Sequence, residues 1–295
     1  MAARLLVLLD LVEPVILAPE EQWKSLDLEG LEVIDPALDS RRPHLAELLR
    51  ERRRKKGFTE EESLARVSDP LLFGALLVSH GDVHGSLAGA ANTTGAVLRA
   101  GLWGVGKAPG ISTVSSSFYM VMPTTGGGDE RVLTFADGAV VPDPDAAQLA
   151  EIAIAAAAAR TRVVGDQPRV AFLSYSTHGS ASGPMVAKVR EATAMFRERA
   201  PEVMADGELQ LDAALIPSIA ANKAPDSAVA GRANVLIFPD LNSGNIGYKL
   251  VERLCGAHAV GPIVQGLAHP CNDLSRGASV EDIVNVACIT SLMAD

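Results

Sequence analysis

Residues 169–184 of this chain have the sequence RVAFLSYSTHGSASGP. The segment begins with a largely apolar run, Arg169–Ser174, which is typical of a buried strand. The stretch Tyr175–Gly183 is rich in serine and glycine and predicts a turn. Pro184 then occupies a position that favours the first residue of a helix, where its missing N–H is not needed. The segment therefore predicts a strand–turn–helix unit, the building block of a parallel sheet covered by helices.

The same pattern occurs twice more towards the C-terminus. The predicted elements are a strand at Ala233–Asp240, a turn at Leu241–Gly247 and a helix at Tyr248–Leu254, then a strand at Ala259–Gln265, a turn at Asn272–Gly277 and a helix capped by Ser279. Helix N-termini at three such turns expose backbone N–H groups and suit a phosphate or an oxyanion. We expect an anion-binding crevice at the carboxyl ends of these strands. The alternative is that glycine and serine simply make turns and caps.

Earlier segments extend the alternation of strands and helices. The predicted elements are strands at 14–17 and 31–35, a helix at 44–56, a capping box at 59–62, two antiparallel strands at 115–123 and 131–141 around the glycines 126–128, and an alanine-rich helix at 143–162. Together these elements predict an α/β protein.

Composition excludes several classes of protein. The net charge of −10 would repel nucleic acids and anionic membrane surfaces, so we expect no such partner. No apolar run approaches the ~20 residues of a membrane span. The cysteines Cys255, Cys271 and Cys288 form neither an even set nor a CxxC pair, which favours a reducing cytoplasm. No metal site is expected: His80, Asp82 and His84 could place ligands together on a turn, but a His pair without a third partner is more often structural.

One glycine pattern resembles a nucleotide-binding fingerprint. Gly101, Gly104 and Gly106 have the required kind of spacing, but they lie inside or just after a helical stretch and follow no strand. A dinucleotide site is therefore not favoured.

Several motifs, taken together, resemble one enzyme family. They are Ser174–Ser180, Asp206–Gln210, Lys223–Ser227, Phe238–Asn245, Gly261–Gly266 and Asn272–Gly277 (NDLSRG), and they occur in family order. On these residues the chain is similar to the phosphate acetyltransferase/phosphate butyryltransferase family. The resemblance implies two three-layer α/β/α domains, similar to isocitrate dehydrogenase, with the active site in the cleft between them. It places 1–112 plus 265–295 in the first domain and 113–264 in the second, and it implies a homodimer.

The activity implied by the resemblance is reversible acetyl transfer between coenzyme A (CoA) and inorganic phosphate, without a metal or prosthetic group. By similarity, Asp282 takes the proton of the CoA thiol, Ser275 orients the thiol, and Arg276 stabilises charge on the acyl carbonyl. The resemblance also implies contacts with CoA or phosphate for seven residues, which are Arg53, Arg99, Ser176, Thr177, Lys223, Asn245 and Arg253. The partners are thus small-molecule substrates: acetyl-CoA, phosphate and acetyl phosphate.

The residues alone favour a different role for Asp282. Ser279–Asp282 has the spacing of a capping box, in which the Asp282 carboxylate accepts a bond from the Ser279 N–H. A thiol pKa of about 8.5 against about 3.9 for Asp also makes full proton transfer uphill by roughly 6 kcal/mol. An Asp base therefore requires burial of the carboxyl or stabilisation of the thiolate by its neighbours.

Three other functions remain open at this point. They are phosphate butyryl transfer, a non-catalytic acyl-CoA-sensing domain like that of some malic enzymes, and an isocitrate-dehydrogenase-like oxidoreductase. Intact Ser275, Arg276 and Asp282 favour catalysis over sensing, and the missing nucleotide fingerprint argues against the oxidoreductase. Family members normally begin with a strand and a Pro-Glu-Gly turn that this chain lacks, so we expect an exposed strand edge or a gap in the first sheet, which bears on both stability and activity.

Overall fold

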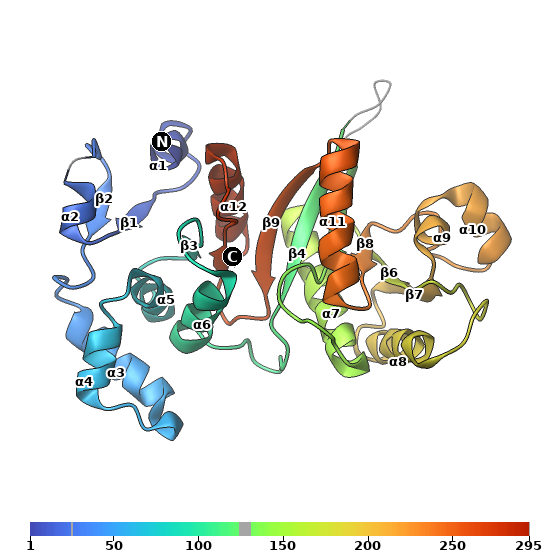
Figure 1. Cartoon of the computed structure of the whole chain (residues 1–295), viewed down its shortest axis with the longest axis horizontal. Helices are drawn as coiled ribbons and strands as arrows, with labels where there is room; N and C mark the ends of the chain where they lie inside the picture. The colour runs from blue at the N-terminus through green and yellow to red at the C-terminus, as the bar shows by residue number, and fades with distance from the viewer. Residues whose placement is uncertain (25, 124–130, 295) are drawn as a thin grey trace. The chain divides into compact units, whose positions relative to one another are not determined.

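The computed structural model of the chain describes residues 1–24, 26–123 and 131–294 (Figure 1). The chain divides into two compact units. Unit 1 comprises Met1–Pro109 and Leu267–Asp295, and unit 2 comprises Gly110–Gly266. Unit 2 is therefore one continuous segment, whereas unit 1 is assembled from both ends of the chain.

A six-stranded sheet forms the centre of unit 2. Its order is β7 (Met204–Leu209), β6 (Arg169–Leu173), β8 (Val235–Ile237), β5 (Arg131–Ala136), β4 (Ser115–Met122) and β9 (His258–Gln265). β4 is antiparallel to both of its neighbours, and the other adjacent pairs are parallel. The carboxyl ends of five strands therefore meet at one edge of the sheet, where β4 begins.

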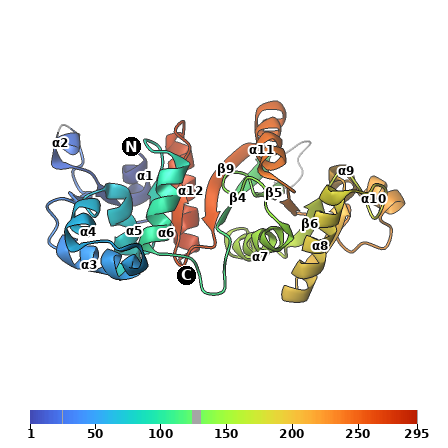
Figure 2. The same cartoon turned by 60° about the horizontal axis from the view of Figure 1, so that its bottom comes forward.

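Helices cover both faces of this sheet (Figure 2). The helices α7 (Ala146–Val163) and α8 (Pro184–Arg199) pack on one face, and α11 (Leu241–Cys255), α9 (Leu211–Leu215) and α10 (Pro217–Lys223) pack on the other. Alternate residues of β6 supply the two cores, because Val170 and Phe172 face one side while Ala171 and Leu173 face the other. Unit 2 thus has the three-layer architecture expected from the sequence.

Local signals in the sequence account for most of these elements. The strand and helix predicted within residues 169–184 are confirmed as β6 and α8, and Pro184 is the first residue of α8. The antiparallel pair predicted at 115–123 and 131–141 is confirmed as β4 and β5, but β5 ends at Ala136, five residues earlier than predicted. The glycine turn predicted between them at 126–128 lies outside the described residues.

The turn predicted at Leu241–Gly247 is wrong. α11 begins at Leu241, and Asp240 caps it by accepting a hydrogen bond from the Ser243 N–H at 2.9 Å. Gly244 serves close packing here, since a Cβ at this position would collide with the main-chain oxygen of Asp137. The glycines that suggested a turn instead allow the helix to approach the end of β5.

Unit 1 combines short parallel strand pairs with helices. Its elements are α1 (Ala2–Leu8), β1 (Val15–Leu17), α2 (Glu20–Trp23), β2 (Glu32–Ile34), α3 (Arg42–Arg52), η1 (Arg54–Lys56), α4 (Glu60–Arg66), α5 (Pro70–His80), β3 (Ser86–Ala88), α6 (Thr94–Gly104), β10 (Cys271–Asp273) and α12 (Val280–Leu292). β1 pairs with β2, and β3 pairs with β10. The β3–β10 pair joins the N-terminal and C-terminal parts of the chain in one unit.

Unit 1 differs from the sequence prediction at the end of β10 and agrees with it at the glycines of α6. Asn272 and Asp273 lie in β10, so the predicted turn at Asn272–Gly277 is too long by two residues. Gly101 and Gly104 lie in α6, and Gly106 follows it, as expected for a pattern that is not a nucleotide fingerprint. Within the described ranges, no helix is both long and apolar enough to cross a membrane.

Candidate active site

The end of β10 is fixed to the start of α6 in unit 1. Asp273 is buried, and its Oδ2 accepts a hydrogen bond from the Thr94 hydroxyl at 2.6 Å. Burial raises the pKa of this carboxyl, and the bond from Thr94 opposes that shift. The Leu274 N–H donates to the Ala88 oxygen at 2.7 Å. The loop that follows β10 therefore starts from a rigid point next to α6.

Ser275 and Arg276 lie in this loop and are exposed. The Ser275 Oγ accepts a weak hydrogen bond from the Gly277 N–H at 3.3 Å, and the Ser275 carbonyl accepts one from Ala278 at 3.0 Å. Among the described residues, the Arg276 guanidinium has no hydrogen-bond or ion-pair partner. The loop thus presents a hydroxyl and an uncompensated positive charge beside the N-terminus of α12.

Asp282 lies in the first turn of α12 and completes the capping box. Its Oδ2 accepts hydrogen bonds from the Ser279 N–H at 2.8 Å and from the Ser279 hydroxyl at 2.9 Å. The Asp282 N–H donates to the Ser279 Oγ at 3.1 Å. The capping role inferred from the motif is confirmed, while the role of Asp282 as a base stays a prediction.

Arg53 and Arg99 lie on the same side of helix α6. The Arg53 guanidinium lies 4.9 Å from the centre of the Trp103 ring and 5.5 Å from that of Phe58. The Arg66 guanidinium lies over the same two rings, 4.9 Å from the centre of the Phe58 ring and 5.4 Å from that of Trp103. Trp103 is four residues after Arg99, so the two side chains share one face of the helix. Stacking on the rings therefore holds Arg53 on the side of α6 that carries Arg99.

In unit 2, Ser176 is part of a buried network after β6. Its hydroxyl is inaccessible and donates to Glu208 Oε1 at 2.7 Å. The same carboxylate accepts hydrogen bonds from the Gly179 N–H at 2.9 Å and from the Arg190 guanidinium at 2.7 and 3.0 Å. Burial by itself would raise the pKa of Glu208, but these bonds outweigh it and lower the pKa from 4.5 to about 2. Ser176 therefore helps to fix the shape of the turn.

Replacement of Glu208 by Gln is expected to destabilise the protein by about 2–3 kcal/mol at pH 7. The stability contribution of a carboxyl with a lowered pKa is complete above its unfolded pKa and disappears as the pH falls through the folded value. With values of 4.5 and about 2, the difference between wild type and variant should fall to about half near pH 3. Urea unfolding at pH 7, 4.5 and 3 measures it. A difference that does not change with pH would contradict the assignment.

Thr177 and Lys223 meet at Gln210. The Gln210 N–H donates to the Thr177 Oγ1 at 2.9 Å, and the Gln210 Oε1 accepts hydrogen bonds from Thr177 at 3.3 Å and from Lys223 Nζ at 2.8 Å. Lys223 also forms an ion pair with Asp212 at 2.9 Å. The structure thus brings these two predicted residues together at the carboxyl ends of β6 and β7.

Asn245 and Arg253 lie apart from each other on α11. The Asn245 Nδ2 donates to the Gly138 oxygen at 2.9 Å, which ties the helix to the end of β5. Arg253 is in the last turn, with its side chain 79% exposed and its Nε 3.5 Å from Glu252. Arg253 follows Asn245 by eight positions, which corresponds to about 12 Å along the helix. Arg253 is therefore distant from the carboxyl edge of the sheet.

The carboxyl edge also contains polar residues that the sequence analysis did not identify. Ser115, Ser116 and Ser117 at the start of β4 are fully buried. The Asp137 carboxylate accepts hydrogen bonds from the Ser116 N–H and hydroxyl and from the N–H groups of Ala139, Val140 and Val141. Three consecutive serines in an otherwise apolar strand could have indicated these buried polar residues from the sequence alone. The long-range bonds of Asp137, Glu208 and Gln210 left no such trace in the sequence.

Comparison with known proteins identifies the family. The family profile described as phosphate acetyl/butaryl transferase matches residues 1–291. The chain belongs to this family. The phosphate acetyltransferase of Acetivibrio thermocellus is 46% identical over 297 residues, covering 99% of this chain and 90% of that protein. A phosphotransacetylase structure from Streptococcus pyogenes has a TM-score of 0.91 and 42% identity, covering 99% of this chain and 89% of the other. For EutD phosphotransacetylase from Staphylococcus aureus the TM-score is 0.89 and the identity 40%, covering 100% of this chain and 90% of the other.

Within this transferase family chain, the predicted site residues form separate groups. Unit 1 holds Arg53, Arg99, Ser275, Arg276 and Asp282, and unit 2 holds Ser176, Thr177, Lys223, Asn245 and Arg253. The resemblance to the family and the α/β fold class are confirmed. The individual roles of the ten residues, and the predicted cleft between the two domains, stay predictions.

Proposed function

We propose that this protein catalyses reversible transfer of an acetyl group between coenzyme A and inorganic phosphate. The observation that carries the proposal is the arrangement at the start of α12. The exposed Ser275–Gly277 loop places a hydroxyl and an unpaired guanidinium directly before the helix turn that contains Asp282. Its support from relatives is the full-length similarity to proteins named phosphate acetyltransferase.

The arrangement suits attack at an acyl carbonyl. In the direction of acetyl-CoA synthesis, Asp282 takes the thiol proton, and the thiolate attacks the carbonyl carbon of acetyl phosphate. The carbonyl oxygen gains negative charge, which Arg276 and the N-terminus of α12 stabilise. The bond from carbon to the phosphate oxygen then breaks, and phosphate leaves. In the opposite direction a phosphate oxygen attacks the thioester, and the departing thiolate recovers its proton from Asp282.

The positive charge of Arg276 also stabilises the thiolate that forms when Asp282 takes the thiol proton. An Asp carboxylate is a much weaker base than a thiolate, by about 4 to 5 pKa units at ordinary values. The Asp282 Oδ2 already accepts two hydrogen bonds from Ser279. Transfer therefore becomes feasible only when a nearby cation lowers the free energy of the thiolate. Arg276 lies six residues before Asp282 and supplies that cation.

An assay of thiol release tests the proposal. Acetyl-CoA is incubated with the protein, phosphate is added, and free thiol is measured, with butyryl-CoA in a parallel reaction. Release from acetyl-CoA that depends on phosphate is the expected result. Faster release from butyryl-CoA would assign the protein as a phosphate butyryltransferase. CoA binding without release from either thioester would favour the acyl-CoA-sensing function.

We propose that the protein acts as a homodimer. Ile246, Leu250 and Leu254 follow one another at intervals of four along α11 and are 57%, 52% and 77% exposed. Such a stripe of large apolar side chains is stabilised by burial against a second copy of the same helix. Sedimentation equilibrium should give the mass of two chains. A mass of one chain at micromolar concentration would contradict the proposal.

We also propose that the reaction needs no metal ion or prosthetic group. Arg276 and the N-terminus of α12 supply the positive charge that the developing oxyanion requires. Activity should therefore survive dialysis against EDTA, and a loss restored by a divalent cation would refute this.

The proposed location is the cytoplasm, consistent with the three free cysteines, Cys255, Cys271 and Cys288. Secretion of the protein by its native cell would contradict that location.

A further inference from the structure

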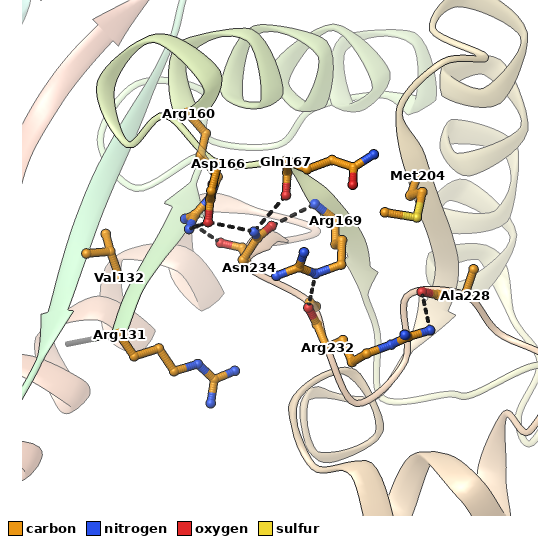
Figure 3. Close-up of a pocket in the computed structure, with 11 residues that line it drawn as sticks. Arg131, Val132, Arg160, Asp166, Gln167, Arg169, Met204, Ala228, Arg232 and Asn234 are labelled. Atoms are coloured by element: carbon orange, nitrogen blue, oxygen red, sulfur yellow. Dashed lines mark hydrogen bonds and ion pairs between the residues drawn. The ribbon is translucent and has the colours of Figure 1, made fainter. Parts of the chain in front are cut away.

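A second group of arginines lines a pocket at the amino edge of the unit 2 sheet, where its parallel strands begin (Figure 3). The pocket has a volume of about 760 Å³. Its lining includes Arg131 at the start of β5, Arg169 at the start of β6, and Arg232 just before β8. The predicted site residues Ser176, Thr177 and Lys223 lie at the opposite edge of the same sheet. The pocket is therefore separate from them.

One of the arginines in the pocket is neutralised. Arg160 is 2% exposed, and its Nε and Nη2 donate to the two oxygens of Asp166 at 2.6 and 2.7 Å. Its Nη1 donates to the Thr134 hydroxyl at 3.1 Å and to the Asn234 oxygen at 3.0 Å. Among the described lining residues Asp166 is the only acid, and its ion pair with the buried Arg160 accounts for its charge.

The other three guanidinium groups lack a hydrogen-bonded carboxylate within the described part of the chain. Arg169 Nε donates to the main-chain oxygen of Arg232 at 2.6 Å, and Arg232 Nη2 donates to that of Ala228 at 3.1 Å. A carbonyl holds a guanidinium in position but leaves its positive charge uncompensated. Arg131 makes no such bond, and Figure 3 shows its guanidinium and that of Arg169 directed towards a common space. The described lining residues thus carry a net charge of +3 in a chain whose net charge is −10.

This concentration of charge specifies the chemistry of a ligand. Guanidinium groups bind phosphate oxygens through paired N–H donors. The volume lies within the range of about 300–1,000 Å³ for small-molecule sites and exceeds what one phosphate ion needs. None of the described lining residues is aromatic, so among them a nucleobase would find no ring to stack on. We propose that this pocket binds a compact, non-aromatic compound with two or more phosphate groups, of which pyrophosphate is the simplest.

Calorimetric titration of the full-length protein with pyrophosphate tests the inference. Saturating CoA is present throughout, so that binding at the predicted CoA site does not contribute. We expect one pyrophosphate per chain, binding more tightly than inorganic phosphate, with an affinity that falls as salt is added. No heat of binding at millimolar pyrophosphate would overturn the proposal.

Variants locate the bound pyrophosphate. Arg131→Gln and Arg169→Gln should each weaken binding about tenfold or more, because each removes charge-assisted bonds. Arg131 has no hydrogen bond to lose in the described structure, so its variant should fold as the wild type does. Arg199→Gln is the matched control, because this arginine of α8 pairs with Glu151 and does not line the pocket. Equal affinity in wild type and Arg131→Gln would refute the assignment to this pocket.

Discussion

Replacing Asp282 by Asn is expected to lower kcat by about 10²- to 10⁴-fold, the usual contribution of a general base. The Asn side chain is nearly the same size and still offers an oxygen to Ser279, so the start of α12 should remain folded. A thiol-release assay measures the rate, and circular dichroism and thermal unfolding check the fold.

Ser279→Ala is the matched control for Asp282→Asn. It removes the hydroxyl from the capping box at a cost of about 1 kcal/mol but leaves the Asp282 carboxylate in place. A base at Asp282 predicts that Ser279→Ala keeps most of the activity while Asp282→Asn loses it. If Asp282→Asn keeps near-native turnover with its fold undisturbed, Asp282 is a helix cap and the proposed mechanism loses its base.

Replacing Arg276 by Gln should reduce kcat by about 10²- to 10³-fold, the loss seen when an oxyanion-stabilising donor is removed. Stability should hardly change, because Arg276 is exposed and forms no ion pair with any described residue. Arg276→Lys should recover only part of the rate, since an ammonium retains the charge but not the planar pair of donors.

The control for Arg276 is another exposed arginine of unit 1. Arg50 on α3 pairs with Glu47 at 2.7 Å, and both side chains are nearly half exposed. Such a surface pair contributes little to stability, so Arg50→Gln should leave both rate and fold unchanged. A similar loss of activity in both variants would show that overall charge matters more than the position of Arg276.

Sequence patterns were reliable where the interactions are local. The capping box at Ser279 and Asp282 depends on residues three apart, and the motif predicted its geometry correctly. The same holds for Pro184 at the start of α8. Such features follow from the preferences of neighbouring residues and need no knowledge of the tertiary structure.

Patterns failed where a distant segment decides the conformation. Gly244 suggested a turn, yet it lies in α11, where the carbonyl of Asp137 leaves no room for a Cβ. The buried role of Ser176 depends on Glu208, which is 32 residues away. The arginines at the amino edge of the sheet come from four separate segments, so no single stretch revealed them. Packing and long-range hydrogen bonds, rather than propensity, determine these features.

The division of unit 1 between the two ends of the chain determines when the protein can become active during its synthesis. β10 and α12 leave the ribosome after unit 2, and until then β3 lacks its parallel partner and the chain has no Ser275, Arg276 or Asp282. Unit 2 is complete earlier, so we expect it to fold first on the nascent chain. Protease resistance of residues 110–266 in chains stalled before β10 would support this order, and its absence would contradict it. Catalytic competence would then be acquired only after β10 and α12 have been synthesised.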